Sequence, residues 1–587
     1  MLRAAAETWG SRPALFQPVG KGEYRRWTWK EYLWTAERIA AGLHAAGVRK
    51  GDIVGLASET RAEFYLADLG VMTAGAVAAA VYTSLPPAEQ VKTLLACQPR
   101  AVFAESPRTL RALDQAGLAG LQAPRFLLSG EDPAAVSLDD LVDSGARVMA
   151  ADPAFIERLQ NGISPQDPAI LYLTSGATGE PKMGLVSHNA VLANCECGPP
   201  VLPLGEDDST LAFLPSAHIT QRLVMELLMI RMGVPVWFSE GLSRMPSELR
   251  TIRPTFFVAP PRVWERIHSS ITAEIRKKPA AVRKLFYMGL GVGSEAARAR
   301  AEGREPAAWV KASLKFFDRA VFSKIRARLG GRIRVAASGA APLGRELAEF
   351  YAAIGLPLIE GYGLTEGGVV ILNPIRNPRP GSIGKPLPGV EVRISEEGEL
   401  LLRGETLFSG YFNDPVSTSA VLRDGWLHTG DLAEIDADGY VWITGRKKEV
   451  IVSSNGKKIF PAKIEGLFKL EPLINQVMLL GDRMPYVTAL FTIQADAAAS
   501  LGLVPPGTPL EEAARAEKVL KAVREIVARV NRQLAPFEQI RKFKILDREF
   551  SIESGEMTPT MKLRRGKVLA NLRDELKDLY MGREEFE

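Results

Sequence analysis

Hydrophobic positions in the first third of the chain alternate between helical and strand-like spacing. Apolar residues recur at helical spacing over 30–43, and Gly47 predicts the end of that helix. The run 53–57 predicts a short buried strand, 64–74 a helix, and 77–82 a further strand. Strand–helix–strand alternation of this kind favours a parallel sheet that helices cover on both faces.

The pattern persists through the middle of the chain. Further strands are predicted at 236–238, 255–258 and 333–336, with helices between them. A long basic helical stretch with several aromatic side chains runs between 271 and 319. We interpret it as a solvated helical cap rather than a nucleic-acid surface, since charged helices usually face solvent.

The pattern of hydrophobic and polar positions changes twice towards the C-terminus. After Pro374, short β-like runs at 390–394, 399–403 and 440–444 predict a β-rich subdomain. From Lys447 onward, short strands at 450–453, 476–480 and 487–492 mix with amphipathic helices at 513–534 and 565–580. The pattern therefore predicts an α/β protein. A large N-terminal domain (1–446) has parallel and mixed sheets covered by helices, and a small α+β domain (447–587) follows it.

Composition narrows the classes of function. A chain of 587 residues is too long for one hydrophobic core, so at least two domains are expected. A formal net charge of +5 gives no sign of nucleic-acid binding, although it permits contact with nucleotides or anionic lipid. Cys97, Cys195 and Cys197 suffice for neither a disulfide framework nor a zinc site.

No run of about 20 apolar residues is present, and the first 15 residues lack the pattern of a secretory signal. We therefore expect a cytoplasmic protein. Peripheral contact with the inner face of a membrane and a homodimer are both left open.

A segment rich in glycine and hydroxyl groups is the first candidate for chemistry. The strand-like run 169–173 leads into it, and it ends at Lys182. Glycine and small hydroxylated residues let backbone N–H groups approach phosphate oxygens, while a lysine supplies countercharge. The segment is not a Walker A loop, because no Gly-Lys-Ser/Thr follows at the required spacing. A glycine-rich segment alone is more often only a turn. The motifs that follow it in the chain therefore decide whether it is interpreted as a phosphate-binding loop.

Seven segments in a fixed order resemble the motifs of the adenylate-forming superfamily, which includes acyl-CoA synthetases, firefly-type luciferases and peptide-synthetase adenylation domains. They are 174–182 with His188, LPSAH at 214–218, SGAAPL at 338–343, EGYGLTE at 360–366, TGD at 429–431, GRKKE at 445–449 and PTMKLRR at 559–565.

Finer signatures resemble long-chain fatty acyl-CoA synthetases. They are PT at 254–255 with PRVWE at 261–265, the helical insert that ends near 326 followed by GGR at 330–332, and GDRMPY at 481–486. Two positions depart from the family pattern: Ala177 stands where Thr is usual, and Met183 where Gly commonly follows the lysine.

The resemblance implies an ATP site and a set of catalytic groups. Its ATP- and AMP-binding residues would be Thr174, Ser175, Gly176, Ala177, Thr178, Gly179, Lys182, Gly339, Ala340, Ala341, Gly361, Tyr362, Gly363, Leu364, Thr365, Asp431, Arg446 and Lys562. Its catalytic residues would be Thr365, Glu366, Arg446 and Lys562. Asp431 would accept hydrogen bonds from the ribose hydroxyls, and Tyr362 would pack on adenine.

Charge neutralisation is the chemical need behind these residues, because a carboxylate must approach the α-phosphate of ATP. Lys562 would bridge the two anions. Glu366, with the Thr174 hydroxyl near the same ion, would bind Mg²⁺, which prefers carboxylates, phosphate oxygens and water.

A second half-reaction, thiol attack on the acyl-adenylate, proceeds in the family after the small domain rotates. By resemblance, Lys448 would be the hinge residue, and the motion would exchange Lys562 for the segment with Ser454 and Gly456. These two residues and His218 would form the acyl and coenzyme A pocket. Alone, His188 and His218 are better explained as packing residues than as acid–base groups.

These features predict a long-chain fatty acid–CoA ligase, which forms acyl-AMP and pyrophosphate from a fatty acid and ATP, and then acyl-CoA and AMP. An apolar tunnel for chains of roughly 12 to 18 carbons could have walls near His218 and at 236–238, because each buried methylene contributes about 0.8 kcal/mol. Two alternatives remain: a ligase that hands the acyl group to a carrier protein, and a catalytically silent homologue that only binds acyl groups or nucleotides.

Overall fold

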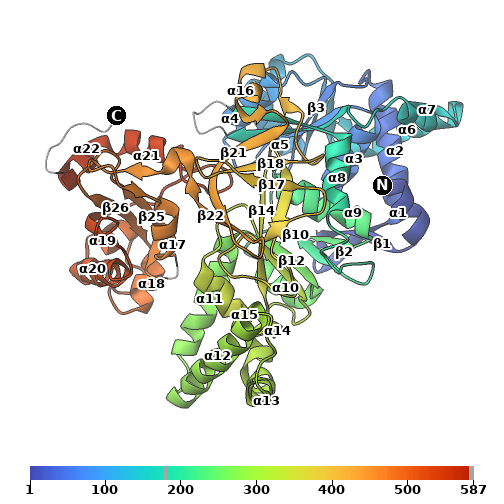
Figure 1. The fold of residues 1–587 in the computed structure, drawn as a ribbon. Helices are drawn as coiled ribbons and strands as arrows, with labels where there is room; N and C mark the ends of the chain where they lie inside the picture. The colour runs from blue at the N-terminus through green and yellow to red at the C-terminus, as the bar shows by residue number, and fades with distance from the viewer. Residues whose placement is uncertain (176–180, 470, 581–587) are drawn as a thin grey trace.

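Two sheets, with helices between and outside them, make up most of residues 1–446 in the computed structural model, which describes residues 1–175, 181–469 and 471–580 (Figure 1). The first sheet is parallel except at β9 and β19. Its strands, in spatial order, are β19 (Gly410–Tyr411), β9 (Pro181–Ser187), β8 (Pro168–Ser175), β4 (Val77–Ala80), β3 (Ile53–Ala57), β5 (Ala101–Ala104), β6 (Arg125–Leu127) and β7 (Val136–Ser137).

The second sheet is parallel at its centre and antiparallel at its two edges. Its strands, in spatial order, are β16 (Lys385–Pro386), β15 (Gly368–Leu372), β14 (Leu358–Leu364), β13 (Val335–Ser338), β12 (Phe256–Ala259), β10 (Thr210–Ala212), β11 (Val236–Phe238), β1 (Pro13–Gly20) and β2 (Glu23–Thr28). The strands predicted in this region are confirmed.

Both sheets are buried on both faces, which explains the uninterrupted apolar runs in their strands. In β3, Val54 and Leu56 join the core shared by the two sheets, whereas Ile53 and Ala57 join the core on the outer face. In β12, Phe256 and Val258 point to the shared core, and Phe257 points to a third core. The alternation places helices in three layers around two sheets.

Helices fill these layers. The shared core includes side chains from α1 (Leu2–Trp9), α2 (Trp29–Ala45), α3 (Ala62–Thr73), α6 (Leu138–Ala151), α8 (His188–Glu196), the π-helical segment η2 (Gln221–Leu227) and α9 (Leu228–Met232). On the outer face of the first sheet lie α4 (Pro87–Ala96) and α5 (Pro107–Gln115). On that of the second lie α10 (Met245–Ile252), α11 (Pro261–Arg276) and α15 (Arg345–Ala353). The predicted helices 30–43 and 64–74 are confirmed as α2 and α3.

The basic stretch predicted between 271 and 319 forms a helical insert that projects from the second sheet, at the bottom of Figure 1. It consists of the end of α11, α12 (Ala280–Ala301), α13 (Ala308–Phe317), the π-helical segment η3 (Asp318–Phe322) and α14 (Ser323–Ala327).

A third sheet links the large sheets to the C-terminal part, and it confirms the predicted β-rich subdomain. It contains β17 (Glu391–Ile394), β18 (Glu399–Arg403), β21 (Trp426–Ile435) and β20 (Leu422–Arg423), with β22 (Val441–Arg446) paired to β21; α16 (Pro415–Val421) precedes β20.

Residues after Arg446 pack into hydrophobic cores of their own. They form β23 (Ile451–Val452), β24 (Lys458–Ile459), β25 (Ile474–Leu480), β26 (Val487–Ile493) and β27 (Ile540–Ile545), with α17 (Pro461–Gly466), α18 (Ala495–Ser500), α19 (Leu510–Arg515), α20 (Glu517–Asn531), α21 (Arg565–Asn571) and α22 (Arg573–Lys577). Within the described ranges, no helix is both long enough and apolar enough to cross a bilayer.

Two helices predicted as continuous are broken. The segment 513–534 divides into α19 and α20 at Ala516, which is extended (φ −67°, ψ 129°) and ends one helix while it begins the other. The segment 565–580 divides at Leu572 into α21 and α22. Alanine and leucine favour helix, so local preference does not explain these breaks.

Candidate active site

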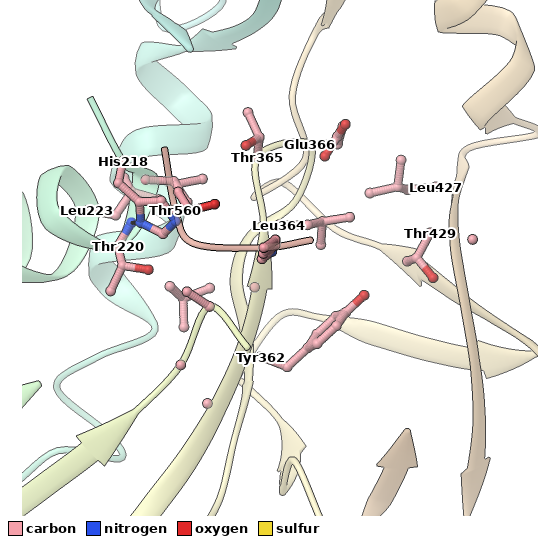
Figure 2. Close-up of a pocket in the computed structure, with 18 of the residues that line it drawn as sticks. His218, Thr220, Leu223, Tyr362, Leu364, Thr365, Glu366, Leu427, Thr429 and Thr560 are labelled. Carbon is pink, nitrogen blue, oxygen red and sulfur yellow. Dashed lines mark hydrogen bonds between the residues drawn. The ribbon is translucent and has the colours of Figure 1, made fainter. Parts of the chain in front are cut away.

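A cavity of about 920 Å³ lies between residues 1–449 and the segment 558–566 of the C-terminal part. Figure 2 shows its residues converging from separate elements: His218 and Leu223 on one side, Tyr362 and Thr429 on the other, and Glu366 above. Because both parts of the chain form its walls, a change in their relative position would change the cavity.

One side of this cavity holds the residues that the sequence predicts to bind the nucleotide, and three of their side chains are linked by hydrogen bonds. Tyr362 donates from its hydroxyl to Oδ2 of Asp431 at 2.5 Å, and Nε of Arg446 donates to Oδ1 at 2.8 Å. The pairing of β21 with β22 puts Asp431 directly opposite Arg446. Burial raises the pKa of Tyr362 well above its usual range, and the Asp431 carboxylate raises it further. The phenol therefore stays protonated and holds the carboxylate in place.

Glu366 lies after the end of β14 and accepts a hydrogen bond at Oε1 from the hydroxyl of Tyr411, at 2.6 Å. Nζ of Lys182 lies 4.7 Å from the centroid of the same tyrosine ring. Burial raises the pKa of Tyr411, and the Glu366 carboxylate raises it further, so the hydroxyl remains a donor.

The arrangement around Glu366 fits a magnesium ion. Within the described ranges, Oε2 of Glu366 receives no hydrogen bond, while Oε1 is oriented by Tyr411. A cavity-facing carboxylate with one oriented and one available oxygen suits an ion that takes one or two protein carboxylates and completes its shell with phosphate and water.

Lys562 enters the cavity on a tight turn. Thr558 N donates to the Lys562 carbonyl at 2.8 Å, and Lys562 N donates to Oγ1 of Thr558 at 3.0 Å. Met561 has φ +63°, a left-handed conformation that costs a non-glycine residue roughly 1 kcal/mol. The turn therefore stores some strain to present the neighbouring lysine.

Protein encloses the Lys562 ammonium on most sides, although solvent reaches it through the cavity. Burial lowers the pKa of Lys562, and the Arg446 charge lowers it further. The carboxylates of Asp431, Glu449 and Glu366 act in the opposite direction. Lys562 therefore stands among the groups that the sequence assigned to the nucleotide and the metal.

His218 lines the same cavity and lies near Lys562. Its Nδ1 accepts a hydrogen bond from Thr220 N at 3.2 Å, so a neutral ring carries its proton on Nε2. Burial lowers the pKa of His218 to about 4, and the Lys562 charge contributes. The imidazole is therefore neutral at neutral pH and does not compete with Lys562 for an anion.

Beyond His218 the cavity becomes apolar. Apolar lining comes from η2, the start of α9, β12 and the loop before β10, and it includes Leu202, Leu223, Val224, Leu228, Phe256 and Val258. The predicted wall at 236–238 is wrong: β11 does not line the cavity, because Trp237 stacks on Phe16 with centroids 3.8 Å apart and Phe238 packs on Tyr65.

A fully buried ion pair holds the back of η2. Nε of Arg222 donates to Asp68 on α3 at 3.2 Å, and its Nη2 also contacts that carboxylate. Nη1 donates to the Ala78 carbonyl at 3.3 Å. Because a buried charge is costly without its partner, the pair keeps one face of η2 on the core while Leu223 and Val224 face the cavity.

Backbone segments that pack closely against one another shape the rest of the predicted nucleotide-binding side. A Cβ on Gly363 would lie 2.6 Å from the Gly368 carbonyl oxygen, so only glycine fits there. The buried Glu360 accepts from Leu343 N at 2.9 Å and so anchors the loop 338–343; burial raises its pKa to about 8. Gly339 and Ala340 of that loop line the cavity.

Family models match most of the chain. The model described as AMP-binding enzyme matches residues 2–412, and the model described as AMP-binding enzyme C-terminal domain matches residues 448–584. The chain belongs to the AMP-binding enzyme family. It is 36% identical over 551 residues to the long-chain-fatty-acid–CoA ligase FadD15 of Mycobacterium tuberculosis, covering 92% of this chain and 90% of that one. It is 25% identical to the human long-chain-fatty-acid–CoA ligase ACSBG2, covering 99% and 91%.

Solved structures of adenylate-forming enzymes share the fold. The adenylation domain of a carboxylate reductase from Mycobacterium chelonae superposes with a TM-score of 0.75 at 22% identity, covering 99% of this chain and 90% of that one. The anthranilate CoA ligase AuaEII, in complex with anthranoyl-AMP, superposes with a TM-score of 0.70 at 22% identity, covering 97% and 96%. The predicted α/β fold class is confirmed.

Most predicted site residues of this AMP-binding enzyme lie together. Those that line the cavity are Lys182, His218, Gly339, Ala340, Gly361, Tyr362, Gly363, Leu364, Thr365, Glu366, Arg446, Lys448 and Lys562, and Asp431 joins them through Tyr362 and Arg446. Gly176, Ala177, Thr178 and Gly179 lie outside the described residues, as do the side chains of Thr174 and Ser175.

Three further predicted residues are not among those that line the cavity. Ala341 does not line it. Ser454 and Gly456 lie on the exposed turn between β23 and β24, where Ser454 N donates to the Met484 carbonyl and Gly456 has φ +76°. The part that these two residues would take after a rotation stays a prediction.

Sequence reasoning missed Tyr411 and Glu399, and it predicted an apolar wall near His218 without identifying η2 as the element that forms it. Tyr411 orients Glu366, and Oε1 of Glu399 accepts from Gly430 N at 2.9 Å beside Asp431. Neither lies in a motif with recognisable chemistry. The segment η2 was not singled out because it is apolar on one face and carries Arg222 and Glu226 on the other, a pattern that is also typical of an ordinary amphipathic surface helix.

Proposed function

We propose that the chain is an AMP-forming long-chain fatty acid–CoA ligase, which joins a fatty carboxylate to ATP and then transfers the acyl group to coenzyme A. The observation that carries the proposal is the position of Lys562, which lines one cavity together with His218 and a set of apolar side chains and lies near Asp431 and Arg446. The relatives named long-chain-fatty-acid–CoA ligase support a long-chain fatty acid as the substrate and coenzyme A as the acyl acceptor.

In the first half-reaction a carboxylate oxygen of the acid attacks the α-phosphorus of ATP, and the bond to the pyrophosphate oxygen breaks. Lys562 binds the acid's carboxylate and the α-phosphate together and offsets the charge that grows between them. Asp431, held by Tyr362 and Arg446, accepts hydrogen bonds from the ribose hydroxyls. Neutral His218 contacts the acid beside its carboxylate, while the apolar wall excludes water from the chain.

Glu366, with the Thr174 hydroxyl, would hold Mg²⁺ against the phosphates. When bound, the ion neutralises phosphate charge and so favours departure of pyrophosphate. Tyr411 keeps the Glu366 carboxylate turned towards the cavity.

In the second half-reaction the thiol sulfur of coenzyme A attacks the acyl carbon, and the bond to AMP breaks. We place the domain boundary at 446/447 and the hinge at Lys448, which lines the cavity within the short helix η4 (Lys447–Glu449). Separate hydrophobic cores on the two sides of this point support a rotation there. The rotation would withdraw Lys562 and bring Ser454 and Gly456 towards the pantetheine arm.

The test is ATP-dependent AMP release with a panel of fatty acids, with and without coenzyme A, and with holo acyl carrier protein as an alternative acceptor. We expect acyl-CoA formation with the greatest kcat/KM at roughly 12 to 18 carbons, because apolar burial accumulates by about 0.8 kcal/mol per methylene. A maximum at acetate or at an aromatic acid would overturn the long-chain assignment. Acyl transfer to the carrier protein alone would overturn the acceptor, and no turnover with any acid would support a silent homologue.

A further inference from the structure

Behind η2, a group of buried polar atoms lacks hydrogen-bond partners. Within the described ranges, neither carboxyl oxygen of Glu226 takes part in a hydrogen bond, and Oε1 of Gln221 accepts none. The hydroxyls of Tyr32 on α2 and Tyr172 on β8 are also without a partner there. All four side chains are at most 2% exposed. The large majority of buried polar side-chain atoms form a hydrogen bond, so five unpartnered atoms around one segment require an explanation.

These side chains lie close to one another. Glu226 follows Arg222 by four residues on η2, so the two are neighbours on one face of the segment. The Arg222 guanidinium lies over the Tyr172 ring, 5.5 Å from its centroid. Burial raises the pKa of Tyr32 and of Tyr65 on α3, and the nearby Glu226 carboxyl group raises both further. The unpartnered atoms therefore form one polar cluster on the side of η2 that faces the core.

This cluster contains one more acid than base. The single buried cation, Arg222, is already matched by Asp68, to which its Nε and Nη2 donate, while its Nη1 donates to the Ala78 carbonyl. An ionised Glu226 would therefore be a buried charge without a counterion, which is costly. Burial raises the pKa of Glu226 well above its usual range, and the Asp68 charge raises it further. The Glu226 carboxyl group is thus uncharged at neutral pH and offers an O–H donor as well as an acceptor.

Internal water fits the donors and acceptors of this cluster. Neutral Glu226 and the two phenols supply O–H donors, and Oε1 of Gln221 and the second Glu226 oxygen supply acceptors. A buried water typically forms about three hydrogen bonds to polar groups that the protein leaves unsatisfied. A monovalent cation would require an ionised Glu226 and would be repelled by the neighbouring Arg222 guanidinium. Water is therefore the ligand that the cluster favours.

The cluster lies on the same seven-residue segment as Leu223, which lines the acyl part of the cavity. We propose that Glu226 is a positioning residue for that part of the cavity: its carboxyl group, bridged by internal water to the Gln221 amide and to the two phenols, holds η2 with its apolar face towards the acid. This inference rests on the proposed function, because it takes the apolar lining to be the wall for the acyl chain.

The first experiment tests the uncharged carboxyl group and needs no turnover. An unperturbed glutamate has a pKa of about 4.3, so above that pH Glu226 is ionised in the unfolded chain and neutral in the folded one. Its contribution to stability is complete below that pH and is lost as the pH rises towards the pKa in the folded protein. Glu226→Gln keeps the shape and has no proton to lose. The difference in Tm, variant minus parent, should therefore increase from about pH 5.5 to about pH 8.5.

The other ionisable groups around Glu226 are Asp68 and Tyr65 on α3, Arg222 on η2, Tyr32 on α2 and Tyr172 on β8, and all of them are unchanged in Glu226→Gln. Their effects on Tm are common to the parent and the variant, so the difference in Tm isolates position 226.

Glu248→Gln on α10 is the matched control. Glu248 is also buried, but its carboxylate accepts hydrogen bonds from Oγ of Ser239 at 2.5 Å and from Glu240 N at 2.7 Å. This variant should lower Tm, because it replaces an acceptor that has its donors. The difference in Tm from the parent should not increase over the same pH range.

The second experiment tests the positioning role by equilibrium dialysis of radiolabelled dodecanoate, without ATP or coenzyme A. Glu226→Leu removes the polar group and should raise the Kd about fivefold or more, the effect of losing one or two buried hydrogen bonds that hold the wall. Glu226→Gln should restore the Kd to within about twofold of the parent, and Glu248→Gln should leave it unchanged. In turnover assays, Glu226→Leu should raise KM for dodecanoate more than it lowers kcat.

Four results would overturn the inference. A difference in Tm for Glu226→Gln that stays constant with pH would show an ionised Glu226 in the folded protein. A parent that does not bind dodecanoate, or a Glu226→Leu variant that binds it equally well, would remove the positioning role. In crystals soaked in rubidium chloride, an anomalous peak at the cluster would replace water by a monovalent cation. By contrast, if the parent binds dodecanoate but forms no acyl-AMP, the proposed function fails while the expected effects at Glu226 still support this inference.

Discussion

At the scale of single residues, Lys562 is the side chain on which the two half-reactions are expected to differ. Its turn places the ammonium near His218 and near Arg446, Asp431 and Glu366. A charge in that position helps a phosphoryl step, where negative charge accumulates, more than it helps thiol attack on an acyl carbon.

Lys562→Ala should slow acyl-adenylate formation by about 10²–10³-fold, the usual effect of removing one preorganised charge stabiliser. Thioester formation from supplied acyl-AMP should keep most of its rate. Pyrophosphate exchange and acyl-CoA release measure the two steps, and Lys567→Ala, an exposed lysine on α21, is the control. Equal damage to both steps would contradict this role.

Glu366 and Tyr411 form a pair in which charge and orientation can be tested separately. Glu366→Gln keeps the shape but removes the charge, so the rate should fall about tenfold or more and the Mg²⁺ concentration for half-maximal rate should rise. Tyr411→Phe removes only the hydroxyl that orients the carboxylate, and should lower the rate with a smaller shift in the Mg²⁺ titration. If Glu366→Gln leaves that titration unchanged, Glu366 is structural.

At the scale of elements, η2 decides the shape of the apolar region. The seven-residue π-helical segment turns Leu223 and Val224 to the cavity while Arg222 binds Asp68 behind it. π-Helical segments are uncommon and often lie at functional sites. The cavity wall is therefore one face of an element whose other face is anchored by charge.

Leu223→Trp should shorten the apolar region and move the maximum of kcat/KM to shorter acids, with the rate for short acids largely kept. Each methylene that no longer fits loses about 0.8 kcal/mol, or roughly fourfold in kcat/KM. Leu227→Met on the same segment is the control, because Leu227 is buried in the core and does not line the cavity. An unchanged chain-length profile would mean that the acyl chain lies elsewhere.

At the scale of the whole molecule, a contact outside the cavity joins the two parts of the chain. Nη2 of Arg262 on α11 donates to Oδ1 of Asn475 on β25 at 2.8 Å and also contacts its carbonyl. Nδ2 of Asn475 donates to Glu549 at 2.7 Å. This contact belongs to the arrangement in which Lys562 is in the cavity.

Arg262→Ala should weaken that arrangement by about 1 kcal/mol, since the hydrogen bonds are partly exposed, and so slow pyrophosphate exchange about fivefold. Acyl-CoA formation from supplied acyl-AMP should be unchanged or faster. Arg266→Ala, exposed on the same helix, is the control. A loss confined to the thioester step would show that the contact favours the other arrangement.

Lys448→Pro tests the hinge. Proline fixes φ and disfavours the helical conformation of the residue before it, here Lys447 in η4. Pyrophosphate exchange should persist while acyl-CoA formation falls. A melting curve must accompany the assay, because loss of both steps together with a lower Tm would indicate damage to folding.

Much of this molecule follows from sequence alone. Short apolar runs and helical periodicity determined α2, α3 and the central strands of both sheets, because burial on both faces leaves a continuous hydrophobic signature. The order of seven motifs determined the family and the residues near the nucleotide. Those residues are recognisable because phosphate, ribose and metal chemistry demands particular groups at particular spacings.

Only the tertiary structure decided which residues complete the site. Tyr411, 45 positions from Glu366, became its hydrogen-bond partner through the pairing of β19 with β9. Of the two predicted apolar walls, the one near His218 is formed by η2, whereas aromatic packing on Phe16 and Tyr65 turns β11 away from the cavity. The breaks at Ala516 and Leu572 contradict local helix preference. For Tyr411 and β11, contacts between residues distant in sequence decide the outcome, and local pattern does not record such contacts.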